Sequence, residues 1–187
     1  IVYDGDAERV YDEESAPAPL NAYGRSKAAF DAILAARTEP ICVVLRLSNI
    51  LGPPHPYVNT GTKFLQSLDA KLRGSEQMTL FEDEFRNFLW VEDLVAVVVK
   101  LVQDFAAARP LPHRLFICGG PESLNRIDLA HALIKAKEYS LTYQGADGVE
   151  VPRCVPVPRA TVDLGYPTPL CIRLRSARVE EYLGGRC

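Results

Sequence analysis

Two short, nearly continuous apolar segments constrain the fold of this chain more than any other feature. One covers residues 41–47 (Ile-Cys-Val-Val-Leu-Arg-Leu) and the other covers residues 114–118 (Arg-Leu-Phe-Ile-Cys). Runs of this length and composition are typical of strands that are buried on both faces of a parallel sheet. Each run follows a segment with helical periodicity, residues 22–37 and 91–107. This alternation of helix and strand predicts an α/β fold built around a parallel sheet.

The rest of the chain adds weaker elements of both kinds. Apolar spacing predicts a helix at residues 62–73, a short strand at 78–81 and a further helix at 129–137. Residues 151–169 are rich in proline, and the last amphipathic segment covers 172–183. The sequence contains no internal repeat that would indicate a solenoid.

Charge and hydropathy exclude two classes of function. The 187 residues carry 21 Lys+Arg against 24 Asp+Glu, a formal net charge of -3. This balance gives no basic surface for nucleic acid or for an anionic membrane. No window reaches the roughly 18 uninterrupted apolar residues that a membrane-spanning helix requires. We therefore expect neither a nucleic-acid partner nor a membrane.

The cysteines and histidines argue against a disulfide framework or a metal centre. The 5 cysteines never occur in C-x-x-C spacing, and Cys42 and Cys118 lie within the apolar runs. His55, His113 and His131 are far apart and form no paired metal-binding motif. The pattern predicts free thiols, no metal site and a reducing compartment such as the cytoplasm.

The first residues indicate that this chain is part of a larger protein. The sequence begins with an apolar run at residues 1–3 that leads directly into a turn at residues 4–6 (Asp-Gly-Asp). We therefore expect the chain to start inside a strand. A targeting segment that preceded Ile1 would leave no trace here.

The strongest chemical candidate is the pair Tyr23 and Lys27. A spacing of four places both side chains on one face of a helix. A neighbouring ammonium group favours the phenolate, and this makes proton exchange with a substrate carbonyl feasible. A pair of this spacing also arises by chance in a chain with 8 tyrosines. The pair by itself therefore does not decide the function.

The order of the surrounding motifs extends this interpretation. Seven segments occur in register: residues 2–5 (Val-Tyr-Asp-Gly), 11–14 (Tyr-Asp-Glu-Glu), 18–21 (Ala-Pro-Leu-Asn), 23–27 (Tyr-Gly-Arg-Ser-Lys), 45–52, 84–94 and 116–122. Together they resemble the extended short-chain dehydrogenase/reductases, in particular the RmlD-like branch. That branch contains dTDP-4-dehydrorhamnose reductase and the regulatory beta subunit of methionine adenosyltransferase.

The resemblance implies roles for four residues around a nicotinamide cofactor, NAD or NADP. Tyr23 would protonate the substrate carbonyl oxygen, and Lys27 would assist it and hydrogen-bond the nicotinamide ribose. Leu47 and Asn49 would lie along the nicotinamide side of the cleft.

Two further residues would contact a nucleotide-sugar substrate. Arg86 matches the position at which related enzymes place an arginine near the nucleotide phosphates, and Asp4 lies where the branch approaches its substrate. Simpler interpretations stay open for both. Arg86 follows Asp83 and Glu84 and is also compatible with a solvated salt bridge, and Asp4 is also compatible with a turn residue.

The resemblance also predicts domain organisation and function. Residues 1–51 and 87–118 would form the C-terminal part of a Rossmann-like NAD(P)-binding domain, and residues 52–86 and 119–187 an interleaved substrate-binding portion. The Gly-rich phosphate-binding turn and the third catalytic residue of the family are absent and would precede Ile1.

We expect a family function of NAD(P)-dependent reduction of a keto group on a nucleotide-activated sugar. The chain itself is expected to be an incomplete fragment that is inactive alone. The alternative is a non-catalytic regulatory subunit that binds a methionine adenosyltransferase catalytic subunit.

Overall fold

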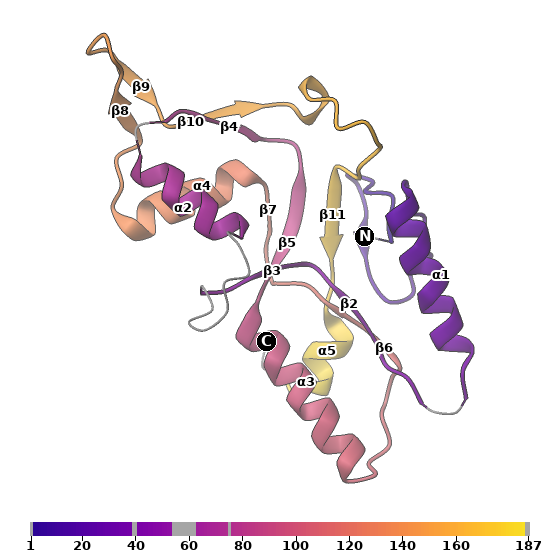
Figure 1. The fold of residues 1–187 in the computed structure, drawn as a ribbon. Coiled ribbons are helices and arrows are strands. Elements are labelled where there is room, and N and C mark those ends of the chain that lie inside the picture. Colours follow the sequence, from indigo (N-terminus) through magenta and orange to yellow (C-terminus); the bar gives the residue numbers. More distant parts are fainter. Residues whose placement is uncertain (1, 39–40, 54–62, 75, 186–187) are drawn as a thin grey trace. The chain divides into compact units, whose positions relative to one another are not determined.

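The chain divides into two compact units, each assembled from separate stretches of sequence (Figure 1). The computed structural model describes residues 2–38, 41–53, 63–74 and 76–185. The first unit contains Ile1–Leu51, Arg86–Ser123 and Asp163–Cys187, and the second contains Gly52–Phe85 and Leu124–Val162. The two units are considered separately below.

The first unit contains helices and mostly parallel strands. Its elements are β1 (Val10–Tyr11), α1 (Ala22–Ala36), β2 (Val44–Leu47), β3 (Asn49–Leu51), β5 (Phe85–Trp90), α3 (Val91–Ala106), β6 (Leu115–Cys118), β7 (Ser123–Leu124), β11 (Cys171–Leu174) and α5 (Ala177–Tyr182). Strand β2 pairs in parallel with β6, and a second sheet has the order β1-β11-β5-β3, with β7 also paired to β5. The pairs β1/β11 and β3/β5 are parallel as well. The predicted α/β class with parallel pairing is confirmed.

Strand β6 contributes side chains to two hydrophobic cores. Phe116 and Cys118 belong to one cluster, which α3 and α5 complete, whereas Ile117 belongs to another cluster with Val2 and Tyr3. Because successive side chains of a strand point to opposite faces, a strand with a core on each face is apolar throughout. This packing explains the continuous apolar run that the sequence shows at this point.

The other apolar run is only partly a strand. β2 begins at Val44 rather than at Ile41, and its residues are half-buried or exposed rather than buried on both faces. Among the described residues β2 pairs with β6 alone, so one of its edges has no neighbouring strand.

The expectation that the chain starts inside a strand is wrong for the described residues Val2 and Tyr3. Both are buried, but neither belongs to a strand. The Val2 carbonyl accepts a hydrogen bond from the Ala18 N–H at 2.9 Å, so a loop satisfies this backbone in place of a strand partner. Ile1 lies outside the described residues.

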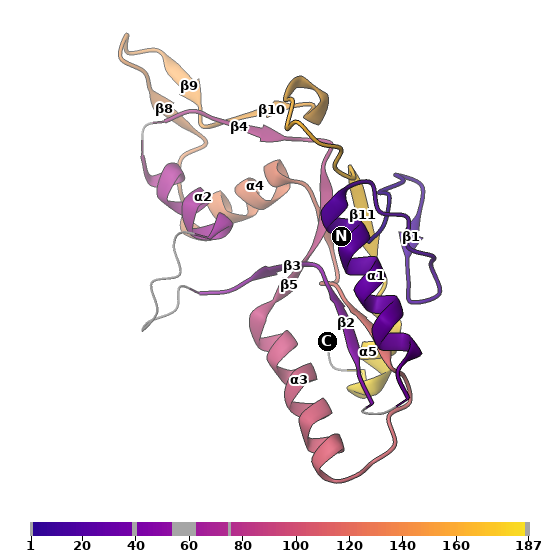
Figure 2. The ribbon, with the colours of Figure 1, turned by 45° about the vertical axis from the view of Figure 1, so that its right-hand side comes forward.

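The C-terminal amphipathic segment contains both a strand and a helix. β11 ends at Leu174 and the short helix α5 starts at Ala177 (Figure 2). Both belong to the first unit. The described residues 163–185 are therefore compact with that unit, although the sequence predicts them in the substrate-binding portion. Which ligand each portion binds stays a prediction, because compactness does not identify a ligand.

The second unit is smaller and also mixes helices with strands. Its elements are α2 (Phe64–Arg73), β4 (Met78–Phe81), α4 (Arg126–Lys137), β8 (Thr142–Gln144), β9 (Glu150–Pro152), β10 (Cys154–Val157) and a 3-10 turn, η1 (Arg159–Thr161). β10 pairs in parallel with β4, and β8 and β9 form an antiparallel hairpin. Helix α4 begins with a capping box, in which Asn125 and Asp128 each satisfy the other's backbone N–H.

Candidate functional site

Helix α1 presents the Tyr23 and Lys27 side chains together. The helix starts at Ala22 because Asn21 caps it, with its side-chain oxygen accepting from the Gly24 N–H at 2.9 Å. One turn separates the two residues, and the Lys27 Nζ lies 5.5 Å from the centroid of the Tyr23 ring. The Tyr23 side chain is 62% exposed. The predicted pair is thus brought together with its phenol accessible to a ligand.

A pocket of about 330 Å³ adjoins this pair within the first unit. Its lining comes from the N-terminal loop, α1, β2, β3, β5 and β11, and consists of Val2, Tyr3, Tyr23, Lys27, Asp31, Leu45, Arg46, Leu47, Ser48, Asn49, Arg86, Asn87, Ile172 and Leu174. Five of the six predicted site residues are in this set. The pocket therefore combines apolar walls with several polar groups, which is the usual composition of a small-molecule site.

The lining of the pocket contains a mostly buried ion pair between α1 and β2. The Arg46 Nε donates to the Asp31 Oδ2 at 2.9 Å, and the two side chains are only 12% and 18% exposed. A second guanidinium nitrogen of Arg46 donates to the Tyr3 Oη at 2.8 Å. Burial acts to lower the pKa of Arg46, but the hydrogen bond to Asp31 and the contact with Tyr3 outweigh it and raise that pKa. Arg46 is therefore a fixed cation.

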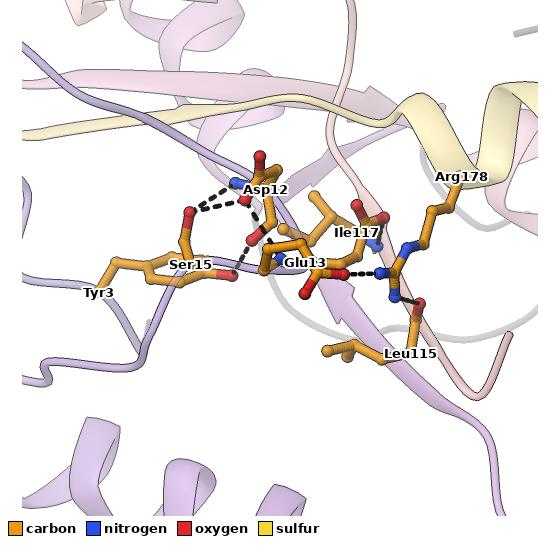
Figure 3. A network of polar contacts seen from close by, with 8 residues as sticks. Tyr3, Asp12, Glu13, Ser15, Leu115, Ile117 and Arg178 are labelled. Atoms are coloured by element: carbon orange, nitrogen blue, oxygen red, sulfur yellow. Dashed lines mark hydrogen bonds and ion pairs between the residues drawn. The ribbon is translucent and has the colours of Figure 1, made fainter.

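Tyr3 connects Arg46 to the N-terminal loop. Figure 3 shows Tyr3 beside Asp12 of this loop. The Tyr3 hydroxyl donates to the Asp12 carbonyl at 3.1 Å, and the Tyr3 ring stacks on Tyr11 with centroids 4.5 Å apart. Burial raises the pKa of Tyr3 even though Arg46 acts to lower it, so the phenol stays neutral. Next in the loop, the Glu13 carboxylate accepts from the Ile117 N–H at 2.8 Å, which attaches the loop to β6.

Residues 47–49 follow Arg46 along the pocket. Leu47 and Asn49 both line it and are exposed, as expected for residues that would contact a ligand. Between them, the Ser48 N–H donates to the Cys118 carbonyl at 3.0 Å. The Ser48 Oγ is buried and has no hydrogen-bond partner among the described residues. A buried hydroxyl without a partner is uncommon in proteins.

Strand β5 contributes Arg86 and Asn87, which cross-link the wall of the pocket. Arg86 is only 9% exposed and donates to the Leu170 carbonyl at 2.8 Å and to the Pro169 carbonyl at 2.5 Å. It is therefore not a solvated surface residue. Asn87 donates to the Gly120 carbonyl at 2.6 Å. Both residues line the pocket while they also fix neighbouring backbone segments.

Asp4 lies outside the lining of this pocket and has a partner within the N-terminal turn. Tyr11 donates to its Oδ1 at 2.5 Å, and this hydrogen bond is the main cause that lowers the pKa of Asp4. Gly5 follows with a φ of +83°, and a Cβ there would lie 2.4 Å from the Pro169 Cβ. Asp4 thus has a role in a turn that requires glycine next to it. Its contact with a substrate stays a prediction.

Sequence reasoning missed several residues of the pocket, namely Tyr3, Asp31 and Asn87. For Asp31 a signal was present, because it lies four residues after Lys27 and eight after Tyr23, on the same helix face. Nothing in the sequence indicated that Arg46 would pair with it.

The described part of the chain shows neither a metal-binding cluster nor a membrane-spanning helix. No group of three or more His, Cys, Asp or Glu residues there is placed to hold a metal ion. No helix in that part is both long and apolar enough to cross a membrane. None of Cys42, Cys118, Cys154 and Cys171 takes part in a disulfide. His55 and Cys187, which the sequence analysis considered, lie outside the described residues.

Comparisons with known proteins agree on a family and a fold. The model of the family described as RmlD substrate binding domain matches residues 1–183. A dTDP-4-dehydrorhamnose reductase from Clostridium acetobutylicum superimposes with a TM-score of 0.75 at 17% identity, over 98% of this chain and 57% of that chain. The corresponding reductase from Bacillus anthracis, solved in complex with NADP, has a TM-score of 0.69 at 18% identity and covers 94% and 53%.

A solved dehydratase shares this architecture, and an epimerase is similar in sequence. A dTDP-glucose 4,6-dehydratase from Streptomyces venezuelae, solved with NAD, has a TM-score of 0.67 at 22% identity and covers 99% of this chain and 52% of that chain. The sequence of an ADP-L-glycero-D-manno-heptose-6-epimerase from Alkalilimnicola ehrlichii is 29% identical over 127 residues, which are 62% of this chain and 38% of that protein. The resemblance to the RmlD-like branch and the Rossmann-like α/β fold are confirmed. The chain spans about half the length of these solved relatives, and less of the epimerase.

Proposed function

Because this chain belongs to the RmlD substrate binding domain family, we propose that it is part of an NAD(P)-dependent oxidoreductase that reduces a keto group on a nucleotide-activated sugar. The observation that carries the proposal is the placement of Tyr23 and Lys27 on one face of α1, beside a pocket that apolar and polar groups line. A phenol next to an ammonium group is a suitable proton donor for a carbonyl oxygen.

The residues of the pocket fit one end of a dinucleotide. A volume of about 330 Å³ lies near the lower limit of the roughly 300–1,000 Å³ that ligand sites span, which suits a nicotinamide and its ribose rather than a whole dinucleotide. Lys27 and Asn49 supply polar groups for a ribose. Leu47 supplies an apolar contact for a ring.

In the proposed reaction Tyr23 acts as the general acid. Lys27 and Asn49 would hold the ribose of a bound NAD(P)H, which would supply the hydride for the reduction. Tyr23 then donates its phenolic proton to the carbonyl oxygen, which becomes the product hydroxyl. The positive charge of Lys27 stabilises the phenolate that remains, because opposite charges a few ångströms apart favour the ionised form. The exposure of Tyr23, 62%, leaves room for a sugar to approach it.

Arg86 and Asp4 are the proposed substrate contacts. Arg86 brings a guanidinium to the pocket wall on β5, and its position there is rigid because two of its N–H groups already bind the carbonyls of Leu170 and Pro169. A fixed cation of this kind attracts a phosphate of the nucleotide without paying the entropy of ordering a long side chain. Asp4 is an ionised carboxylate, since its pKa is lowered, and would accept hydrogen bonds from sugar hydroxyls.

The proposal assigns the two portions of the chain different ligands. Residues 1–51 and 87–118 would bind the nicotinamide end of the cofactor, and 52–86 and 119–187 the nucleotide sugar. The 187 residues contain no Gly-rich dinucleotide-binding turn. We therefore expect residues 1–187 alone to bind NAD(P)H more weakly than micromolar and not to turn over. Fluorescence titration of NADPH with purified 1–187 measures this, and micromolar binding would contradict the expectation.

The experiment for the function uses the protein expressed from its whole reading frame. Oxidation of NADPH and of NADH is followed while dTDP-4-keto-6-deoxysugars are supplied, and the sugar product is identified by mass spectrometry. The proposal predicts cofactor oxidation that matches the loss of the keto sugar mole for mole. No oxidation with any nucleotide-activated keto sugar, despite cofactor binding, would refute it.

The regulatory alternative makes a different prediction. A subunit resembling the methionine adenosyltransferase beta subunit would copurify with a methionine adenosyltransferase catalytic subunit and change its activity without consuming NAD(P)H. A pull-down with that catalytic subunit, alongside the assay above, separates the two functions. We favour the enzyme because Tyr23 is exposed next to Lys27 at a pocket, which a purely regulatory surface does not require.

A further inference from the structure

One face of α1 carries a carboxylate as well as the proposed catalytic pair. Tyr23, Lys27 and Asp31 follow one another at intervals of four residues, and all three line the same pocket. Residues at this spacing are neighbours on a helix surface, and a Lys and an Asp there form an ion pair when nothing else competes. Asp31 is therefore the natural competitor of Tyr23 for the Lys27 ammonium group.

In the structure the Asp31 carboxylate forms its ion pair with a different cation. Arg46, on β2, donates from its Nε to the Asp31 Oδ2 at 2.9 Å, with both side chains mostly buried. Arg46 is itself held by the Tyr3 hydroxyl at 2.8 Å, and its carbon Cζ lies 5.5 Å from the Tyr3 ring centroid. Lys27 meanwhile extends over the Tyr23 ring at 5.5 Å, and no ion pair joins it to Asp31 among the described residues.

We infer that Arg46 is a positioning residue: by engaging Asp31, it leaves Lys27 directed at Tyr23. The inference rests on the proposed roles of Tyr23 and Lys27. It adds Arg46, which bonds to Asp31 and Tyr3, and gives an electrostatic reason for its presence. Tyr3 takes part as the second anchor, because it fixes the guanidinium on the side of the N-terminal loop.

Loss of the guanidinium charge has a predictable consequence. The Asp31 carboxylate is 18% exposed, and a mostly buried carboxylate without a cation is unfavourable. Lys27 is the nearest cation along the helix face, so its side chain turns from Tyr23 towards Asp31. An exposed ion pair at this spacing changes the ratio of paired to unpaired side chains by about twofold, and the partial burial of Asp31 increases this change.

The test measures the contact between Lys27 and Tyr23 directly, without cofactor or substrate. Nuclear Overhauser effects between the Lys27 ε-methylene protons and the Tyr23 ring protons are recorded on the folded protein with selectively labelled Lys and Tyr. Arg46→Gln removes the charge and keeps an amide donor for Asp31. Arg114→Gln is the matched control. Arg114 also links α1 to the chain around β2, but it does so through the carbonyls of Leu34 and Cys42, whereas Arg46 forms the ion pair with Asp31.

The expected result has two parts. Arg46→Gln lowers the Lys27–Tyr23 effect by at least about twofold, and Arg114→Gln leaves it unchanged. Adding Asp31→Asn to Arg46→Gln restores the effect, because the competing carboxylate is gone. An unchanged effect in Arg46→Gln overturns the inference. A loss that persists in the double variant also overturns it, since Arg46 would then act only through packing. If Arg46→Gln is too unstable for spectra, an osmolyte that favours the folded state allows the same comparison.

The magnetic resonance test of Arg46 and the assay of the proposed function can fail independently of each other. If the reductase assay fails while the magnetic resonance pattern is as expected, the function is wrong and Arg46 still positions Lys27. If the protein reduces a keto sugar but Arg46→Gln leaves the Lys27–Tyr23 contact unchanged, the function stands and the inference about Arg46 falls.

Discussion

Gly120 is the position at which a single methyl group should do most damage near the site. Gly120 follows β6, and its carbonyl accepts a hydrogen bond from Asn87 at 2.6 Å. A Cβ placed on Gly120 would lie 1.6 Å from the Phe88 carbonyl oxygen and 2.6 Å from the Phe88 carbonyl carbon. The obstacle is the backbone of β5, which carries both Arg86 and Asn87, so no flexible side chain can give way.

The magnitude follows from this distance. Because real Cβ contacts essentially never fall below 3.0 Å, β5 and the chain after β6 must separate by more than an ångström. Overpacking that side chains can absorb costs about 1–3 kcal/mol. Since Gly120→Ala requires backbone movement and also strains the hydrogen bond to Asn87, we expect it to lower the free energy of unfolding by at least about 3 kcal/mol.

Equilibrium denaturation in urea measures this loss, with Gly74→Ala as the matched control. A Cβ on Gly74 makes only ordinary contacts, the nearest at 3.4 Å to the Lys71 carbonyl oxygen, and its φ of -78° suits alanine. That variant should be neutral, or more stable by up to about 1 kcal/mol. A loss below about 1 kcal/mol for Gly120→Ala would refute the close packing of β5 against the end of β6.

Three further predictions concern other parts of the chain. Partial burial and the hydrogen bond to Asp104 raise the pKa of Tyr182 to about 12. The contribution of this phenol to stability is therefore complete below the ordinary tyrosine pKa near 10 and is lost as the pH rises towards 12. Tyr182→Phe should remove this alkaline dependence in thermal melts, and an unchanged dependence would count against the hydrogen bond between Tyr182 and Asp104. Ser48→Ala should leave the stability of the free protein unchanged or raise it by up to about 1 kcal/mol, because the Ser48 Oγ has no partner among the described residues, whereas a clear loss in urea denaturation would show that the hydroxyl is bonded. Asn125→Ala removes the side chain that caps α4 by binding the Asp128 N–H at 2.8 Å. It should lower the free energy of unfolding by about 1–2 kcal/mol. Asn125→Ser keeps a capping oxygen, so an equal loss of stability in the two variants would show that the cap does not stabilise α4.

Apolar periodicity was sufficient to predict a helix or strand where that element buries one consistent set of positions. The helix predicted at 91–107 is α3, Val91–Ala106, and the strand at 114–118 is β6, Leu115–Cys118. Both take part in the same core, so their apolar spacing reflects a single environment. The Tyr23–Lys27 contact was also predictable, since it needs only a helix and a spacing of four.

The structure departs from the prediction where long-range contacts decide. Val2 and Tyr3 look like a strand but pack in a loop, because the N-terminal segment meets β6 through Glu13 and Ile117. The proline-rich stretch contains strand β10, with Pro156 in it, next to β4. A proline is compatible with a strand at a sheet edge, where no ladder donor is required of it. Neither arrangement has a local signature.

The ion pair of Arg46 and Asp31 is the clearest case of information that local patterns lack. The two residues are 15 positions apart, on a helix and on the strand that follows it. Each fits its own element without reference to the other, since Asp31 lies on a polar helix face and Arg46 interrupts an apolar strand. Only the packing of α1 against β2 reveals that the two charges meet inside a pocket.

The most direct test of the central claim is the turnover of Tyr23→Phe in the protein expressed from its whole reading frame. Tyr166→Phe is the matched control, because Tyr166 is similarly exposed, at 59%, and does not line the pocket. If Tyr23 is the general acid, its loss should lower kcat for NAD(P)H-dependent keto-sugar reduction by about 10²–10⁴-fold, while Tyr166→Phe retains full activity. Equal turnover of the two variants would contradict the assignment of Tyr23 and, with it, the reaction proposed for this site.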